Sequence, residues 1–523
     1  MRRRQAGIIF VITLCAAAAL LLAACGSGTT GVSAARFKQP IVLKVNAASA
    51  PTRQYAGIIQ NQLKQVGIPC EIETVDFNVL LEQQTKGQFQ LTTGRWVGGN
   101  QDPVYLYDLF RTGSFRNRGR YSNPELDKIL DEAVAAADRA RAKELFVRAQ
   151  EITSRELPQF PLWYSDQMVV ARSNVQNINV PVDGDWRYLR DVTVEGGKSG
   201  PLVVAIESNP ATLDQLRSTD ASGERMRQLM FNSLVRKNEN FDYVGDLASE
   251  IQTAPDGLTY TFKLRDGVKF HNGKTFTSAD AKYTLDTLLA SDSAKANDFF
   301  ETTGGERKPY VKSVEAPDPL TLVVRLNKPL NKFLSNFVSF GMMPQGYTTD
   351  QQKQTPIGTG AFKFVRYEES QQIIDLAAHE AYWGGAPAVK QLRVRTILDA
   401  NTLQAELRSG GIDLAAVANL QPDTYEALKQ DKNLKVAQFP GVNVVYMLFN
   451  VTEQPLSDAR VRQAIAYSID RQAIVKELLL GQARVANSIL PEQSWAYSPG
   501  QVYEFNPEKA KQILDEAGYK AGQ

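Results

Sequence analysis

Residues 41–45, Ile-Val-Leu-Lys-Val, form an apolar run that is typical of a β-strand, and the chain that follows them decides the fold class. From Tyr55 to Val66 the apolar residues recur at helical spacing, and Gly67 ends that helix. Residues 71–75, Glu-Ile-Glu-Thr-Val, then alternate as a half-buried strand does. A strand, a helix and a second strand in this order predict a right-handed crossover in an α/β sheet.

Further elements are marked by local signals. Asn123-Pro124 and Asn506-Pro507 each place a capping Asn before a Pro, which predicts a helix start at both positions. Between residues 259 and 276 the pattern alternates around a turn at 265–267, which predicts a hairpin.

The N-terminus predicts export. Arginines at residues 2–4 precede an apolar run over residues 8–22, and the run ends in small residues before Cys25. This is the pattern of a secretory signal with a cleavage site. It resembles bacterial lipoprotein signals, and that resemblance implies that the thiol of Cys25 is acylated. The alternative is a plain transmembrane anchor, for which the run is just long enough.

Composition predicts a folded protein with more than one core. The chain has 523 residues, of which 43% are hydrophobic and 22% charged, and it is too long for one ordinary core, so we expect two lobes. Because 59 Lys and Arg balance 57 Asp and Glu, nothing in the charge favours a nucleic-acid partner. If Cys15 leaves with the signal and Cys25 is acylated, as that resemblance implies, we expect no intramolecular disulfide. We expect the remaining Cys70 to be a small buried hydrophobe.

Two sets of motifs carry a family resemblance. Asp-Gly-Leu-Thr-Tyr-Thr-Phe at 256–262, Gly-Val-Lys-Phe-His-Asn-Gly-Lys at 267–274 and Gly-Thr-Gly-Ala-Phe at 358–362 resemble segments from the front of the extracellular solute-binding proteins of the peptide/nickel class. Trp-Val-Gly-Gly-Asn-Gln-Asp-Pro at 96–103 and Tyr-Ser-Asn-Pro-Glu at 121–125 resemble segments from the back of the same family. In the family the second set follows the first, whereas here it comes before it.

This inverted order predicts a circular permutation of a whole fold. The stretch Glu-Gly-Gly-Lys-Ser-Gly at 195–200 has the glycine-rich composition expected where the family's two ends are joined. The new ends then fall at 518–523 and just before Ile41, in what we expect to be an exposed loop. The competing account is a fusion of the tail of one binding protein with the head of another.

The resemblance implies a two-lobed, periplasmic-binding-protein-like α/β fold with an extra subdomain in one lobe, in permuted order. We expect the lobes to be joined by two crossing segments near residues 160–164 and 392–397. The expected division is a lipoprotein signal peptide (1–24), a lipidated flexible tether (25–36), the first part of lobe II (37–164), lobe I with the extra subdomain (165–392) and the second part of lobe II (393–523).

The resemblance also implies where a solute binds. Trp96, Gly98, Gly99, Asn100 and Asp102 match a segment that lies at the ligand in the family. Peptide-binding relatives often have an aspartate where this chain has Gly99, and that aspartate pairs with the ligand's amino group. Asp102 is a substitute for it, although Asp before Pro is also a common helix cap. Trp96 is either a ligand contact or a core residue. Asp220, Ala221, Asn419 and Tyr446 align with other positions that line the cleft in the family.

Metal and catalytic sites are not predicted. His271 and His379 are the only histidines of the chain, and histidine ligands normally occur in clusters, so we expect a structural role for both. No metalloprotease, nucleophile-elbow or phosphate-loop motif is present in the sequence. We therefore expect neither a metal, nor a cofactor, nor an enzyme.

The function implied by the resemblance is solute capture outside the cytoplasm. We expect a monomeric lipoprotein, anchored to the membrane through Cys25, that binds an oligopeptide-like solute between its lobes. We also expect the closed form to deliver the solute to the permease of an ABC importer, through closure of the lobes. The alternatives are a module for sensing or chaperoning without transport, and a binder of a non-peptide solute such as a sugar or a metal chelate.

Overall fold

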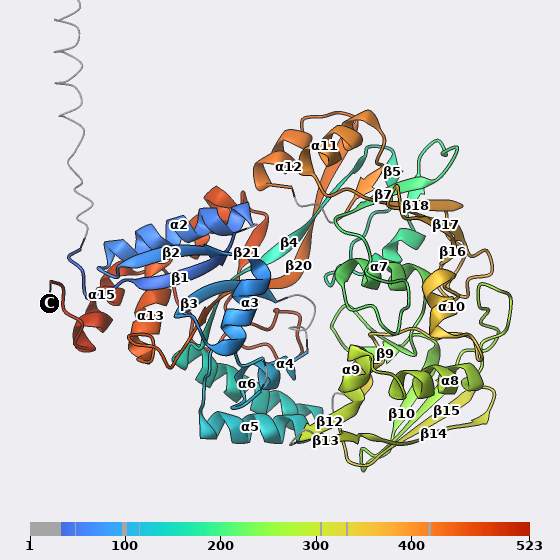
Figure 1. Cartoon of the computed structure of the whole chain (residues 1–523), viewed down its shortest axis with the longest axis horizontal. Coiled ribbons are helices and arrows are strands. Elements are labelled where there is room, and N and C mark those ends of the chain that lie inside the picture. The colour runs from blue at the N-terminus through green and yellow to red at the C-terminus, as the bar shows by residue number, and fades with distance from the viewer. Residues whose placement is uncertain are drawn as a thin grey trace, which may run out of the picture.

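The computed structural model describes residues 33–47, 49–96, 102–114, 116–136, 138–303, 306–330, 333–416 and 420–522. Its elements form two lobes that lie side by side and are joined by two long strands (Figure 1). One lobe contains both described ends of the chain and is called the N/C lobe. The other is built from the middle of the chain and is called the middle lobe. The predicted α/β class and two-lobed organisation are confirmed.

A single sheet runs through both lobes. Among the described residues it has 11 strands in the order β16-β17-β18-β7-β19-β4-β20-β3-β1-β2, with β21 paired to β4. Its two ends belong to different lobes, and β4 and β20 lie at its middle. The strands are β1 (Ile41–Asn46), β2 (Cys70–Val75), β3 (Leu91–Trp96), β4 (Gln159–Arg172), β7 (Leu202–Ile206), β16 (Phe362–Glu368), β17 (Ile373–Ala378), β18 (Gln391–Thr396), β19 (Leu414–Ala415), β20 (Leu434–Phe449) and β21 (Ala483–Val485).

The N/C lobe begins with the predicted strand-helix-strand unit. β1 pairs in parallel with β2, with Ile41 opposite Cys70. Helix α2 (Ala50–Gln65) connects the two strands and carries the side-chain cap of Ser49 at its start. The chain leaves the helix at Gly67, whose φ of +83° lies in the left-handed region that glycine adopts at low cost. Cys70 is half-buried, and burial raises the pKa of its thiol to about 12.

Both helix starts that follow an Asn-Pro pair are confirmed. The side chain of Asn123 accepts hydrogen bonds from the backbone N–H groups of Glu125 and Leu126, at 3.0 and 3.1 Å. The side chain of Asn506 accepts one from Lys509, at 2.9 Å. The other helices of the N/C lobe are α3 (Phe77–Lys86), α4 (Tyr105–Phe110), α5 (Pro124–Ala135), α6 (Arg139–Glu156), α13 (Ala459–Ser468), α14 (Arg471–Ala473), the π-helix η4 (Ile474–Leu478) and α15 (Pro507–Glu516).

β4 and β20 pass from one lobe to the other as an antiparallel pair. In the N/C lobe Val444 of β20 lies opposite Tyr164 of β4, and in the middle lobe Val436 lies opposite Val170. Between these two stretches the register shifts from Phe439 to Asn443. Such an irregularity bends a strand locally and breaks the ladder, which is what a passage between two bodies requires.

The second crossing differs from the one predicted near residues 392–397. Those residues form most of β18, which pairs with β17 on one edge and with β7 on the other, inside the middle lobe. The next elements, α11 (Ala400–Ser409), β19 and α12 (Pro422–Leu428), share a buried core with Met168, Val170 and Ala205. The described residues of 400–416 and 420–434 therefore pack with the middle lobe, and β20 makes the crossing.

The middle lobe also contains a four-stranded antiparallel sheet with its own aromatic core. Its order is β10-β11-β15-β14. The hairpin predicted over residues 259–276 is wrong in its pairing, because β11 pairs with β10 and β15, and only Lys269 and Thr275 bridge each other. The remaining elements are β5 (Val175–Gln176), η2 (Trp186–Arg190), β6 (Thr193–Val194), α7 (Ala221–Met230), β8 (Val235–Lys237), β9 (Tyr243–Gly245), β10 (Ala248–Thr253), β11 (Thr259–Leu264), α8 (Ser278–Leu289), η3 (Ala294–Phe299), β12 (Phe300–Thr303), β13 (Glu306–Pro309), β14 (Val311–Asp318), β15 (Thr321–Leu326), α9 (Phe333–Asn336) and α10 (Thr349–Gln354).

The first and last described segments of the chain lie against each other. Arg36 donates a hydrogen bond from Nη1 to the backbone oxygen of Tyr519 at 2.7 Å, and pairs with Asp515 at 2.5 Å. The rings of Phe37 and Tyr519 lie 4.9 Å apart. The backbone N–H of Gly522 donates to the oxygen of Ala35 at 2.9 Å.

In the part of the chain that the structure describes, none of the helices combines the length and the apolar character needed to cross a bilayer. The predicted signal peptide and the acylated Cys25 lie outside the described residues.

Candidate functional site

Trp96 and Tyr446, two of the predicted site residues, are brought into direct contact. Their rings are stacked at 4.9 Å with an interplanar angle of 16°, and Tyr105 meets the Trp96 ring edge-on at 5.5 Å. We call Trp96, Tyr105 and Tyr446 the aromatic cluster. The indole nitrogen of Trp96 donates to Gln159 Oε1 at 3.0 Å, which fixes the orientation of the ring.

The pairing of β3 with β20 builds this cluster. Trp96 lies opposite Val444, and Gly94 lies opposite Tyr446. A Cβ at position 94 would come within 2.5 Å of the hydroxyl oxygen of Tyr446, so only glycine lets that ring lie across β3. Burial raises the pKa of Tyr446, and the positive charge of Arg118 opposes this rise.

Two arginines border the aromatic cluster. The guanidinium of Arg118 lies 5.9 Å from the centre of the Trp96 ring, and that of Arg116 lies 5.6 Å from the centre of the Tyr105 ring. Among the described residues Nε of Arg118 has no hydrogen-bond partner, although it is buried. An unmet buried donor is costly, so this edge of the cluster favours an acceptor group.

Asp102 follows the Trp96 segment and contacts the opposite lobe. Its Oδ1 accepts a hydrogen bond from the backbone N–H of Val104 at 3.0 Å, two residues on, as in an Asx turn. The predicted cap role is wrong, because the N-cap of α4 is Val104 and no side chain caps that helix. Its Oδ2 accepts a short hydrogen bond from the hydroxyl of Tyr243, in β9 of the middle lobe. Burial and the charge of Asp102 raise the pKa of Tyr243 well above its usual value, so this phenol stays a donor.

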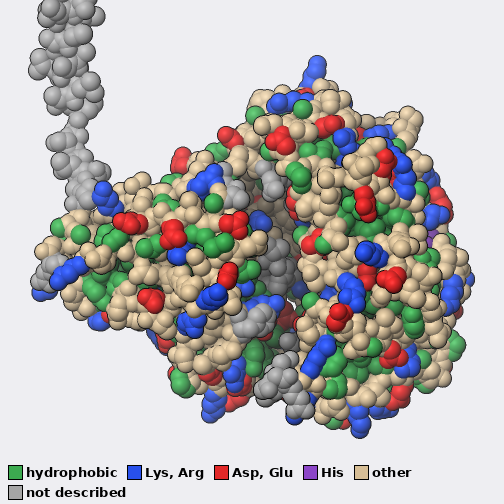
Figure 2. All heavy atoms as spheres, in the orientation of Figure 1, with side chains coloured by type: hydrophobic (Ala, Val, Ile, Leu, Met, Phe, Trp, Pro, Cys, Tyr) green, Lys and Arg blue, Asp and Glu red, His purple; other side chains and the backbone are tan. Residues whose placement is uncertain are grey.

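A second polar contact joins the lobes close by. Arg139 at the start of α6 forms a short ion pair with Asp242, which precedes β9. The same guanidinium lies 4.8 Å from the centre of the Trp495 ring. We call the Asp102–Tyr243 and Arg139–Asp242 pairs the interlobe contacts. Figure 2 shows the surface hollowed between the two lobes.

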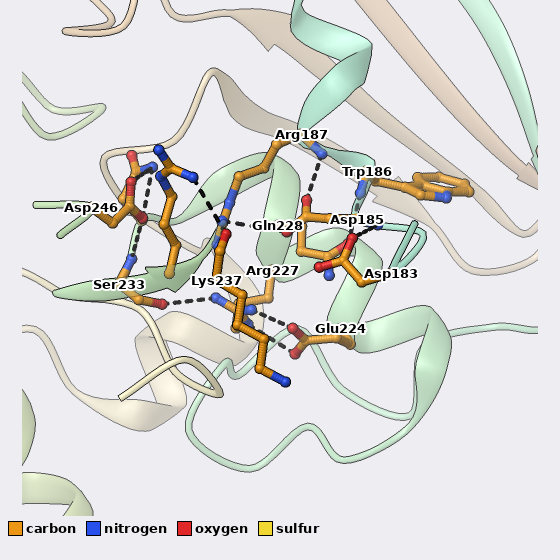
Figure 3. A network of polar contacts seen from close by, with 12 residues as sticks. Asp183, Asp185, Trp186, Arg187, Glu224, Arg227, Gln228, Ser233, Lys237 and Asp246 are labelled. Carbon is orange, nitrogen blue, oxygen red and sulfur yellow. Dashed lines mark hydrogen bonds and ion pairs between the residues drawn. The ribbon is translucent and has the colours of Figure 1, made fainter. Parts of the chain in front are cut away.

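Figure 3 shows a charged network in the middle lobe that includes Lys237, which lies opposite Tyr243 in the pairing of β8 with β9. Arg227 donates to Glu224 at 2.8 Å and to the hydroxyl of Ser233 at 3.1 Å. Arg187 lies 3.3 Å from Asp185, and its Nε and Nη2 have no hydrogen-bond partner among the described residues.

Lys237 is influenced by charge from both lobes. Burial lowers the pKa of its ammonium group, and the negative charges of Asp102 and Asp183 oppose that effect. Burial, followed by the charge of Asp185, raises the pKa of Asp183. Because Asp102 belongs to the N/C lobe and Asp183 to the middle lobe, a change in lobe separation alters the field at Lys237.

Asp220 and Ala221 lie at the start of α7. Asp220 Oδ1 accepts from the backbone N–H of Gly223 at 2.8 Å, and Oδ2 accepts from that of Ala211 at 3.2 Å. Both oxygens of Asp220 thus hold backbone groups of its own lobe. Within the described ranges, no hydrogen bond or ring contact joins Asp220 or Ala221 to the aromatic cluster. Gly98, Gly99, Asn100 and Asn419 lie outside the described residues.

The interlobe residues Arg139, Asp242, Tyr243 and Trp495 were not predicted from the sequence. They belong to no motif, and their contacts join positions more than 100 residues apart, such as Asp102 and Tyr243, separated by 141. Only their residue types, aromatic and charged at loop and element ends, could have drawn attention to them.

The two histidines share one acceptor. His271 Nδ1 accepts the backbone N–H of Gly358 at 3.3 Å, so its Nε2 carries the hydrogen and donates to the oxygen of Gly360 at 3.1 Å. His379 Nδ1 donates to the same oxygen, also at 3.1 Å. Burial lowers the pKa of His271 to about 3. In the described ranges no group of three or more metal-ligating side chains is found.

Known proteins match a large part of this chain. The model of one family, bacterial extracellular solute-binding proteins, family 5 Middle, matches residues 14–117 and 242–523. Heme-binding protein A of Haemophilus influenzae is 33% identical over 338 residues, which cover 60% of this chain and 60% of that protein. The dipeptide-binding protein of Escherichia coli is 30% identical over 345 residues, covering 61% of this chain and 64% of that protein.

A solved structure shares the fold. The ABC transporter substrate-binding protein CtaP of Listeria monocytogenes superposes with a TM-score of 0.51 at 24% identity, over 62% of this chain and 66% of that one. This likeness concerns the fold alone. The chain spans about three fifths of the length of the curated relatives that it matches, 60% and 64% for the two above.

Proposed function

The chain belongs to the bacterial extracellular solute-binding proteins of family 5, and on that basis we propose that it captures a small solute between its two lobes and presents it to an ABC importer. The family resemblance read from the sequence is confirmed by this membership. The family is one of solute-binding proteins, which agrees with the prediction of a non-enzymatic protein.

The observation that carries this proposal is the pair of interlobe contacts. Tyr243 meets Asp102, and Arg139 meets Asp242, so each contact takes one partner from each lobe. Such contacts form only when the lobes approach, and they stabilise a closed form at the expense of an open one. A solute that bridges the same two surfaces shifts the population further toward closure.

For the solute we propose an oligopeptide or a similarly extended polar molecule. Trp96 is the half-buried member of the aromatic cluster and offers part of its ring, and Arg118 beside it offers positive charge for carboxylate or carbonyl groups. The named relatives support a peptide, since one is a dipeptide-binding protein, and they also support a different solute, since another is a heme-binding protein.

We assign Asp102 a role in closure and not in pairing with a ligand amine. Its two carboxylate oxygens already accept from Val104 and from Tyr243. Trp96 remains our proposed solute contact on the N/C lobe, and we propose that Tyr446, which is only 3% exposed and stacks on Trp96, acts by holding that ring in place. Gly98, Gly99 and Asn100 remain proposed on the family resemblance. Asp220, Ala221 and Asn419 stay proposals on the same ground.

We propose that the protein works outside the cytoplasm, tethered by an acylated Cys25, with residues 1–24 as its signal peptide and 25–36 as its tether. A permease of the ABC class and the membrane are then its partners. Labelling of cells with an alkyne fatty acid tests the tether, because wild type should incorporate the label and Cys25→Ser should not.

For the domains we propose the permuted order, with revised bounds. The N/C lobe comprises residues 37–164 and 443–522, and the middle lobe comprises 165–439. Two features support a permutation. The segments around Arg36 and Tyr519 are hydrogen-bonded to each other, as the cut point of a permuted fold requires. The connection after β6 is short and contains Gly196, Gly197 and Gly200, all with positive φ.

The binding proposal is tested with the protein carrying Cys25→Ser, which is free of lipid. Isothermal titration calorimetry with short peptides of mixed sequence should give saturable binding. Small-angle scattering should show a smaller radius of gyration with peptide than without it. Binding of a metal chelate or a sugar, with peptides inert, would change the solute class. If the purified protein binds a solute but cells that lack its gene still take up that solute normally, sensing is favoured over transport.

A further inference from the structure

A cavity of about 200 Å³ lies at the interlobe contacts. Its walls come from both lobes, so it is complete only when the lobes are together. The N/C lobe contributes residues from α5 and α6, the turn before α4 and the segment before α15, and the middle lobe contributes the segment that enters β9. The lining residues are Asp102, Val104, Ala133, Ala136, Arg139, Ala142, Phe146, Phe241, Asp242, Tyr243 and Trp495.

The interior of this cavity is apolar. Ala133, Ala142, Phe146 and Phe241, which line it, are all at least 96% buried. The space exists because three lining residues have short side chains: Ala133 in α5, Ala136 directly after α5, and Ala142 in α6. A longer side chain at any of these positions would occupy the volume that is now open.

The polar residues of the lining are paired with one another. Arg139 pairs with Asp242, and its guanidinium also covers the Trp495 ring. Asp102 accepts the hydroxyl of Tyr243. A guest that offered hydrogen-bonding groups would therefore have to break an existing contact, whereas an apolar guest would leave both contacts in place. The chemistry of the lining favours an apolar group.

The size of the cavity agrees with this chemistry. A dry cavity of about 150 Å³ in another protein accepts benzene, so about 200 Å³ is enough for a phenyl ring or a branched aliphatic side chain. A buried water needs two to four polar partners, and the side chains of Ala133, Ala142, Phe146 and Phe241 offer none. An apolar guest also gains the free energy of leaving water.

We infer that this cavity receives one apolar side chain, aromatic or branched aliphatic, of the captured solute. The inference rests on the proposed function, because it assigns a specificity pocket to the same interlobe space. Since the walls come from both lobes, a side chain in the cavity contacts both, and it stabilises the closed form in which Tyr243 meets Asp102.

Two variants that fill the cavity test the inference, with one matched control. Ala142→Leu places a larger side chain at a buried lining position on α6. Ala136→Leu does so at a half-buried lining position directly after α5, where misfolding is less of a risk. Ala140→Leu adds the same side chain to α6 at an exposed position that does not line the cavity.

The readout is the ratio of dissociation constants for two peptides, Ala-Ala-Ala and Ala-Phe-Ala. Wild type and the Ala140→Leu control should prefer the phenylalanine peptide by about tenfold or more, as burial of a phenyl ring predicts. Both filling variants should lose that preference while the affinity for Ala-Ala-Ala stays within about twofold. A preference that survives in both filling variants overturns the inference and leaves the proposed function intact.

If neither peptide binds, a second probe tests the pocket separately from the proposed capture of a peptide. Fluorobenzene binding, followed by fluorine NMR, reports on the cavity without any peptide. Saturable binding to wild type and to Ala140→Leu, lost in both filling variants, supports the pocket and shows that the solute is not of this peptide class. Failure of fluorobenzene to bind wild type, together with inert peptides, overturns the pocket.

Discussion

The hydroxyl of Tyr243, on the middle lobe, donates to Oδ2 of Asp102, on the N/C lobe, across 141 positions of sequence. The other carboxylate oxygen of Asp102 holds the backbone N–H of Val104, which directly precedes Tyr105 of the aromatic cluster. One carboxylate thus links the local structure of the candidate site to the approach of the two lobes.

Tyr243→Phe should weaken solute binding without unfolding the protein. Removing a hydrogen bond to a charged group costs about 1.5–3 kcal/mol, so the dissociation constant should rise by roughly 10- to 100-fold. The open form lacks this contact, so the melting temperature without solute should change little. Tyr367→Phe is the control, since it removes a hydroxyl from β16, away from the interlobe contacts. Isothermal titration calorimetry measures the solute affinity of both variants. Equal affinities would contradict a role of Tyr243 in closure.

Gly94→Ala should disrupt the aromatic cluster. The added Cβ would lie 2.5 Å from the hydroxyl oxygen of Tyr446, so that ring must move and its stacking on Trp96 is lost. We expect a loss of about 1–3 kcal/mol in the free energy of unfolding, as for other overpacked sites, and a change in tryptophan fluorescence. Gly57→Ala, in α2, is the matched control, because nothing lies within 4 Å of its added Cβ. It should be neutral or stabilising.

The stability of the protein should fall in mild acid because of the buried histidines. The folded-state pKa of His271 is lowered to about 3 by burial, whereas an unfolded histidine titrates near about 6.5. Between these values the unfolded state binds more protons, so the contribution is fully present above about pH 6.5 and is lost as the pH falls toward about 3.

At about pH 5 the unmet protonation of His271 should lower the free energy of unfolding by about 2 kcal/mol relative to neutral pH. Urea unfolding of wild type and of His271→Asn at both pH values measures it, and the variant should lose less stability on acidification. An identical pH dependence for the two proteins would exclude His271 as the cause.

Restoring the family order should give a folded binder. In the reordered chain, residue 198 comes first, and Gly522 is joined through a short Gly-Ser linker to the segment of Arg36. Because Arg36 and Tyr519 already contact each other, this join requires no rearrangement. We expect a melting temperature within a few degrees of wild type and the same solute affinity. Aggregation of the reordered chain, with wild type soluble, would count against a permuted fold and favour a fusion of two relatives.

Local signals in the sequence predicted local structure well. The apolar run from Ile41, the stop at Gly67 and the caps at Asn123 and Asn506 each depend on neighbours within a few residues, and the structure confirms them. The second lobe crossing was misplaced because it depends on long-range pairing. Nothing in residues 392–397 reveals that both edges of that strand are occupied.

The candidate site shows the same division. Trp96 and Tyr446 could be named because family motifs mark their segments, and the β3–β20 pairing then brings their rings together. Tyr243 and Arg139 could not be named, because their importance lies in contacts between lobes that no local pattern encodes. Asp102 was predicted either as a ligand contact or as a helix cap, and the structure instead gives its carboxylate a turn contact with Val104 and an interlobe contact with Tyr243.

Native mass spectrometry of the protein carrying Cys25→Ser, purified without denaturation and then mixed with short peptides, tests the central claim most directly. The account predicts a monomer that carries one non-covalent adduct in the peptide mass range, with a lower adduct fraction for Tyr243→Phe. A monomer that stays bare at saturating peptide concentration, with wild type and Tyr243→Phe indistinguishable, would contradict capture of a peptide between the lobes.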